Sequence, residues 1–162
     1  MPCSPEEYPE ELWVGDRQQP TEVCSSDELY RAVLKVHVHG EKILVAAFQA
    51  GWPECSVNCS SYAKPEHSQF PRPKFEGMGT CALAVKEAED SFAHSDVPDT
   101  YTTKVHADPL ECNISHCVIA VHKATEDKPL TRDNLSPGST LIKRLIRDRW
   151  AENSRLLIEP QK

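Results

Sequence analysis

Residues 101–122 read YTTKVHADPLECNISHCVIAVH and contain two candidate strands on either side of a polar loop. Tyr101, Thr103 and Val105 alternate with polar neighbours, which is the period-two pattern of a half-buried strand. The run 117–121 is apolar at every position, which is typical of a central strand covered on both faces. This stretch therefore predicts a strand–turn–strand unit.

Other apolar patterns extend the predicted fold on both sides of this unit. Alternation over 34–38, a turn at Gly40 and the apolar run 43–48 predict a hairpin. Apolar residues at helical spacing predict helices over about 80–92 and about 140–154. We therefore expect an α+β fold with a small, mainly antiparallel sheet and two helices.

The chain length and the distribution of proline divide the molecule into parts. A chain of 162 residues fits a single domain with one core. Residues 1–26 combine prolines with acidic residues, and we interpret them as an extension lying on the surface of a domain at 27–162. Residues 51–78 are rich in proline and predict a long loop inside that domain.

Charge and cysteine usage narrow the classes of partner. The net charge of -7 arises from 25 acidic and 18 basic residues, which disfavours nucleic acids and anionic membranes as partners. No basic segment followed by an apolar run opens the chain, and no run approaches the roughly 20 apolar residues that span a bilayer. Seven cysteines in such a chain predict reduced thiols or metal ligands, so we expect a cytoplasmic protein.

The polar residues of the 101–122 stretch have two interpretations. In the structural one, Asp108, Asn113 and His116 bond to nearby main-chain groups and hold a strand–turn–strand corner. In the chemical one, His106 or His116 is a general base, Asp108 orients it, and Asn113 donates to a developing negative charge. The chemical interpretation predicts a small hydrolase or nuclease, with a divalent metal held by the Asp and His side chains.

Cysteine spacing offers a different kind of site. Cys55 and Cys59 enclose three residues, and Cys112 and Cys117 enclose four. Both spacings are short enough for two thiolates to share a tetrahedral zinc ion, so the four cysteines predict a zinc-stabilised module. The alternative is that these cysteines are unpaired thiols that pack as small hydrophobic side chains.

Aromatic residues of the long loop and one arginine of the C-terminal helix are candidate binding residues. Trp52, Tyr62 and Phe70 are scattered through the loop, and exposed aromatic side chains commonly anchor protein partners. Arg149 falls within the apolar stripe of the predicted helix, where it must reach solvent or pair with an acid. We expect Asp108 to be that acid.

Residues Gly77 to Thr80, followed by Asp108, Asn113 and His116 in a D-P-x(3)-N-x-x-H pattern, resemble small bacterial proteins of no assigned activity. The resemblance covers about residues 77–122, and it implies a bacterial source and an accessory role beside larger enzymes. It supplies no catalytic residue. Our leading prediction is a non-enzymatic binding or accessory module with a protein partner, and the hydrolase and the zinc module are the alternatives.

Overall fold

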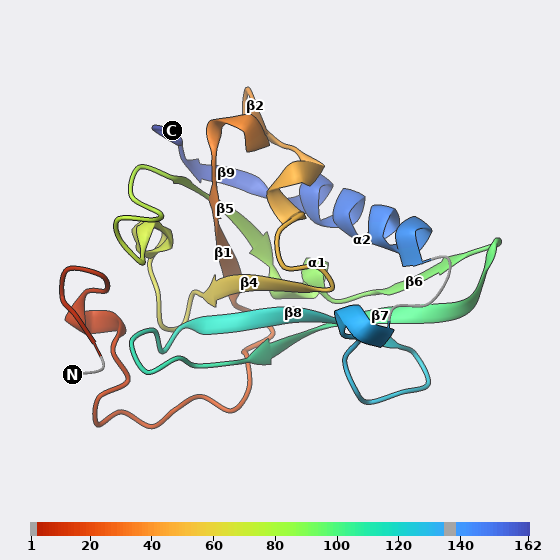
Figure 1. Ribbon diagram of the computed structural model, residues 1–162, viewed down its shortest axis with the longest axis horizontal. Coiled ribbons are helices and arrows are strands. Elements are labelled where there is room, and N and C mark those ends of the chain that lie inside the picture. The colour runs from red at the N-terminus through yellow and green to blue at the C-terminus, as the bar shows by residue number, and fades with distance from the viewer. Residues whose placement is uncertain (1–2, 135–138) are drawn as a thin grey trace.

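A computed structural model describes residues 3–134 and 139–162, and its main element is a seven-stranded antiparallel sheet (Figure 1). The strands run in the spatial order β6-β7-β8-β4-β1-β5-β9. Their bounds are Glu28–Val33 (β1), Glu54–Cys59 (β4), Gly79–Ala84 (β5), Ser91–His94 (β6), Val97–Ala107 (β7), His116–Lys123 (β8) and Arg155–Ile158 (β9). Two helices, α1 (Val85–Ala88) and α2 (Ser139–Asn153), complete the fold, so the expected α+β class is confirmed.

The main core lies between the sheet and α2, which runs along one side of the sheet in Figure 1. Alternate residues of each strand point toward α2, as period-two geometry requires. Trp150 of α2 is fully buried and its ring meets Phe48 edge-on at a centroid distance of 5.7 Å. The other large buried side chains of this core include Leu29, Val33, Ile119, Ile142 and Ile146. Among the described residues, no helix is both long and apolar enough to cross a bilayer.

The 101–122 stretch folds as predicted. Strand β7 contains the alternating residues and β8 contains the apolar run, and the two strands pair in antiparallel register over seven residue pairs. Strand β8 also pairs with β4, so it is an inner strand of the sheet, as the apolar run indicated. Tyr101 and Ile119 are fully buried.

The helix predicted over 80–92 is wrong for most of its length. Residues 79–84 form β5, and only Val85–Ala88 is helical. Because β5 lies between β1 and β9 and is covered on both faces, its side chains are nearly all buried. A fully buried strand presents an unbroken apolar run, which periodicity does not distinguish from a buried helix.

The hairpin predicted around Gly40 is correct at its turn and wrong in its arms. Gly40 adopts a φ of +63°, and β2 (Val38–His39) pairs with β3 (Lys42–Ile43) on either side of it. Beyond these two pairs the chain forms 3-10 turns at Lys35–His37 and Val45–Phe48, so neither arm joins the main sheet. The long strand of this region is β1, which begins earlier in the chain.

The N-terminal segment is packed against the domain. Leu12 is fully buried, and its carbonyl accepts a hydrogen bond from the Ile114 amide at 2.8 Å. Cys3 forms a disulfide with Cys112 in the loop between β7 and β8, which corrects the expectation that the cysteines are reduced thiols or metal ligands. The segment that precedes β1 is therefore fastened to the β7–β8 loop.

Candidate functional site

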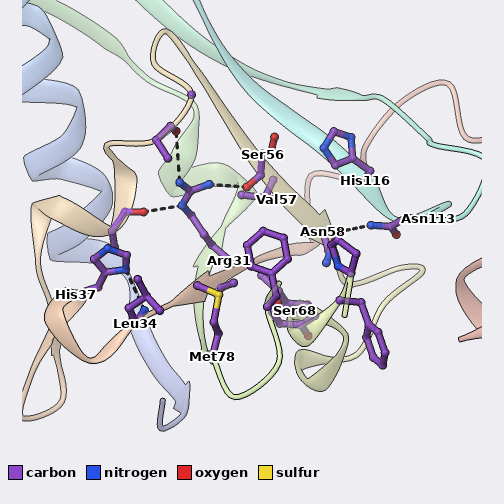
Figure 2. Close-up of a pocket in the computed structure, with 18 of the residues that line it drawn as sticks. Arg31, Leu34, His37, Ser56, Val57, Asn58, Ser68, Met78, Asn113 and His116 are labelled. Atoms are coloured by element: carbon purple, nitrogen blue, oxygen red, sulfur yellow. Dashed lines mark hydrogen bonds between the residues drawn. The ribbon is translucent and has the colours of Figure 1, made fainter. Parts of the chain in front are cut away.

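A pocket of about 820 Å³ opens where β1 and β4 diverge (Figure 2). Strand β1 pairs with β4 at two positions, whereas it pairs with β5 at six. The space left between the diverging strands is lined by the strands themselves, the N-terminal segment, the turns at 46–51, the 68–78 segment and the β7–β8 loop. Ligand pockets commonly span about 300–1,000 Å³, so this one suits a small molecule.

Arg31 of β1 bridges the gap between the strands. Its Nε–H donates to the Ala47 carbonyl at 2.6 Å, and Nη1 donates to the Ser56 carbonyl of β4 at 2.7 Å. Nη2 makes a long contact of 3.5 Å with the Ala50 carbonyl. Figure 2 shows the guanidinium held between these main-chain oxygens, which fixes its position at the edge of the pocket.

The positive charge of Arg31 has no acidic partner among the described residues. No carboxylate lies within salt-bridge distance of it, and no Asp or Glu lines the pocket. A guanidinium has five N–H donors, and the three contacts use one on each nitrogen, so one N–H remains on each terminal nitrogen. Burial and the charge of Arg31 also lower the pKa of His37, which lines the same pocket. The polar side of the pocket therefore favours an anion.

The rest of the pocket is largely apolar. Phe70, Phe75 and Met78 come from the loop before β5, and Tyr8 and Tyr30 come from the N-terminal segment and β1. These rings and the thioether offer a surface against which a hydrocarbon or aromatic group can pack.

Ser68 places one further polar atom among these side chains. It is 3 % exposed, and its Oγ has no hydrogen-bond partner within the described part of the chain. A buried hydroxyl left unpaired costs about 1–3 kcal/mol, because it loses the hydrogen bonds it makes to water in the unfolded chain. The Ser68 hydroxyl lines the pocket and is free to donate to, or accept from, a molecule placed there.

Contacts of the N-terminal segment hold one wall of the pocket. His67, adjacent to Ser68, accepts the Lys64 amide proton at Nδ1 at 2.9 Å, so its Nε2 carries a proton and donates to Glu11. The hydrogen bond from His67 lowers the pKa of Glu11. This contact ties the segment that carries Tyr8 to the segment that carries Ser68.

Three of the four predicted catalytic residues lie near one another, at the β7–β8 end of the pocket. His116 Nδ1 lies 2.8 Å from the Asp108 carbonyl oxygen and 3.3 Å from its carboxylate. Asn113 is buried, donates to Asn58 at 2.9 Å and accepts from Ser115 through its own oxygen. Asn113 and His116 line the pocket. Their hydrogen bonds hold the corner of the β7–β8 loop.

The structure does not bring the fourth residue, His106, to this group. Its Nε2 lies 3.1 Å from Nε2 of His122, further along β7 and β8. Within the described residues, no hydroxyl or thiol side chain forms a hydrogen bond with the His116 ring, so His116 has no partner placed as a nucleophile.

The predicted four-cysteine zinc site is wrong, because Cys112 is held in the disulfide with Cys3. Cys59 and Cys117 contact each other on the α2 side of the sheet, and both are buried. Burial raises the pKa of the Cys55 thiol, which favours the protonated form over the thiolate that zinc requires. Across the described ranges, no group of three or more His, Cys, Asp or Glu side chains is arranged to hold a metal.

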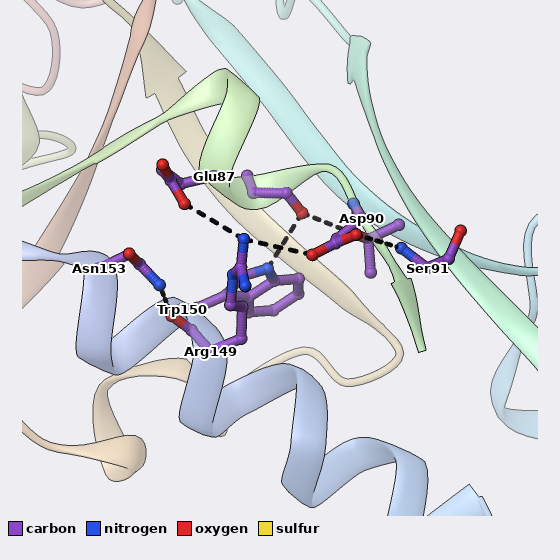
Figure 3. A network of polar contacts seen from close by, with 8 residues as sticks. Glu87, Asp90, Ser91, Arg149, Trp150 and Asn153 are labelled. Atoms are coloured by element: carbon purple, nitrogen blue, oxygen red, sulfur yellow. Dashed lines mark hydrogen bonds and ion pairs between the residues drawn. The ribbon is translucent and has the colours of Figure 1, made fainter. Parts of the chain in front are cut away.

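Of the predicted binding residues, Phe70 lines the pocket and the other three lie elsewhere. Trp52 packs partly buried against the main core, and Tyr62 is exposed outside the pocket. Arg149 lies on α2 and pairs with Glu87 at 3.3 Å and Asp90 at 3.2 Å, as Figure 3 shows, so the expected pairing with Asp108 is wrong. Glu87 lies within α1 and Asp90 lies two residues after it, so the contact joins α2 to α1 and the chain that follows it.

The sequence patterns did not predict Arg31 and Ser68 as site residues, although these two supply the positive charge and the unpaired hydroxyl of the pocket. Arg31 occupies a position between Leu29 and Val33 on the apolar face of a strand. A cation in an apolar stripe is the same signal that drew attention to Arg149. It went unrecognised because the strand was expected to begin at residue 34.

Comparison with known proteins adds no relative. No family model, no curated protein and no solved structure matches the chain. The functional argument therefore depends on the geometry and charge of the pocket.

Proposed function

We propose that the protein is a binding module for a small organic anion with an aromatic or hydrocarbon body. The observation that carries the proposal is Arg31, a cation without an acidic partner at a pocket that no Asp or Glu lines. A carboxylate or phosphate accepts charge-assisted hydrogen bonds from the two remaining guanidinium N–H groups. The chain carries a net charge of -7, so most of its surface attracts cations. The positive charge of Arg31 makes this pocket attract anions instead.

The apolar lining supports the second half of the proposal. An organic group packed against Phe70, Phe75 and Met78 removes their surface from water, at about 25 cal/mol per Å² of apolar area. The Ser68 hydroxyl supplies one further directional contact. Pockets with a few placed polar groups in an apolar lining are the usual form of a small-molecule site.

The other functions predicted from the sequence have less support. A hydrolase using Asp108 and His116 needs a nucleophile or an activated water near the imidazole, and the described hydroxyl groups form no hydrogen bond with it. A protein partner, a bacterial source and an accessory role remain predictions. The binding of an organic anion is compatible with the non-enzymatic module that we expected.

The test is thermal unfolding and calorimetric titration with matched pairs of ligands. The acids 4-phenylbutyrate, phenylacetate and octanoate and the ester phenyl phosphate are compared with 4-phenylbutyramide and the corresponding neutral compounds. Because a ligand stabilises the folded state by RT ln(1 + [L]/Kd), an acid at about 100 times its Kd contributes about 2.7 kcal/mol. We expect stabilisation by at least one anion and a much smaller effect of its neutral partner.

Variants connect this effect to the pocket. Arg31→Met should abolish the preference for the anion, and Phe70→Ala should weaken binding of both members of a pair. Arg17→Met is the matched control, because Arg17 also donates to main-chain carbonyls but does not line the pocket. Since Arg31 also bridges two strands, Ser68→Ala provides a second variant that leaves the strands in place. Equal binding of acids and neutral partners by the folded wild-type protein contradicts the proposal.

A further inference from the structure

A second polar site lies on β7 and β8, distinct from the pocket described above. His106 of β7 and His122 of β8 point to the same face of the sheet, and the cross-strand pair Lys104–Ala120 lies between them in the register. The two imidazoles lean toward each other over the small Ala120 side chain. Their Nε2 atoms are 3.1 Å apart and their ring centroids are 5.4 Å apart.

We propose that the Nε2 atoms of His106 and His122 together bind a first-row divalent transition metal ion such as Zn²⁺. Zinc–imidazole bonds are about 2.0–2.1 Å long, so two nitrogens 3.1 Å apart define an N–Zn–N angle of about 98°. That angle lies between the values for octahedral and tetrahedral coordination. The described residues offer no third His, Cys, Asp or Glu in a cluster with these two, so water fills the remaining positions and the ion exchanges readily.

The environment of His122 prepares its Nε2 as a ligand. His122 is 2 % exposed, and its Nδ1 has no well-formed hydrogen bond. A proton on Nδ1 would leave the lone pair on Nε2, the atom that faces His106. A metal ion binds the neutral imidazole, so the affinity should depend on pH.

Two charged groups bear on the site with opposite effects. Lys104 projects from β7 between the two histidines and repels a cation. Asp127, in the segment after β8, places a negative charge near His122 and attracts a cation. The balance between Lys104 and Asp127 sets the affinity for the metal ion. The proposal therefore predicts variants that strengthen metal binding as well as variants that weaken it.

The experiment is calorimetric titration of the metal-free protein with Zn²⁺ at about pH 7.5, in a Cys24→Ser background that removes the exposed thiol. We expect one Zn²⁺ per chain. His106→Gln should weaken the affinity at least about tenfold, whereas Lys104→Gln should strengthen it several-fold. Lowering the pH to about 5.5 should abolish binding, because both imidazoles must be neutral. His39→Gln, an exposed histidine on β2, is the control and should change nothing.

A spectroscopic measurement keeps the proposal testable where a variant folds poorly. Long-range ¹H–¹⁵N spectra of the wild-type rings should show Zn²⁺-dependent shifts of Nε2 in His106 and His122 and of no other histidine. The proposal is overturned if Zn²⁺ does not saturate the protein below about 1 mM. It is equally overturned if folded His106→Gln binds Zn²⁺ as the wild type does, in which case the two rings share a proton and hold no metal.

Discussion

Removing the Cys3–Cys112 disulfide should lower the free energy of unfolding by about 2–4.7 kcal/mol. The two cysteines are 109 residues apart, so the cross-link closes most of the chain into a loop. In the chain-entropy model, a closed loop of about 100 residues raises the free energy of the unfolded state by about 4.7 kcal/mol, and measured values are commonly about 2–4 kcal/mol. The burial of Leu12 and its hydrogen bond do not involve the cross-link, so we expect the effect to arise mainly in the unfolded state.

The assay compares urea unfolding of the oxidised wild type with that of the Cys3→Ser/Cys112→Ser variant, each with and without reductant. The variant should unfold at lower urea and with a steeper slope, because its unfolded chain is less compact. Reductant should shift the wild type toward the variant and leave the variant unchanged. In denaturant without reductant, the wild type should expose five thiols out of seven cysteines. Seven reactive thiols, or the same midpoint and slope for both proteins, would refute this reasoning.

Three further predictions address the fold and its pH dependence. Gly79→Ala should cost at least about 1–3 kcal/mol, because an added Cβ would lie 2.3 Å from the Ile158 carbonyl; a urea midpoint equal to that of wild type would contradict this. Leu12→Ala should cost about 2–5 kcal/mol in the same assay, since a fully buried leucine is truncated, whereas a loose N-terminal extension predicts no change. Burial and the charge of His106 lower the pKa of His122, so the stability that the neutral ring contributes is present above pH 6.5 and is lost as the pH falls through the lowered value. Urea midpoints from about pH 7.5 to about pH 5 should therefore fall, and less so in His106→Gln.

Local sequence patterns predicted the type of element correctly where only one face of that element is buried. The alternation in β7 and the apolar stripe of α2 gave the correct element types, because each pattern reflects a single exposed side. Strand β5 was misread as a helix because both of its faces are buried. Strand β4 was hidden among prolines, although its own residues, Glu54–Cys59, contain none.

The candidate site depends on contacts between distant parts of the chain, which local patterns do not contain. Arg31 reaches the carbonyls of Ala47 and Ser56, which lie 16 and 25 residues away. The Cys3–Cys112 pairing removes a predicted zinc ligand from a position 109 residues along the chain. By contrast, the contact of Asp108 with His116 spans eight residues within one stretch of the chain, which a local pattern can contain.

The narrow pairing between β1 and β4 divides the sheet into two blocks, β6-β7-β8-β4 and β1-β5-β9. Two residue pairs, the hydrogen bond from the Ser60 amide to the Glu28 carbonyl and the side chain of Arg31 connect the blocks at that seam, so amide hydrogens flanking it should exchange with solvent sooner than those between β1 and β5. A molecule held in the gap would contact both blocks at once. It would then slow amide hydrogen exchange along the whole seam. Binding would therefore be detectable by hydrogen exchange as well as by calorimetry.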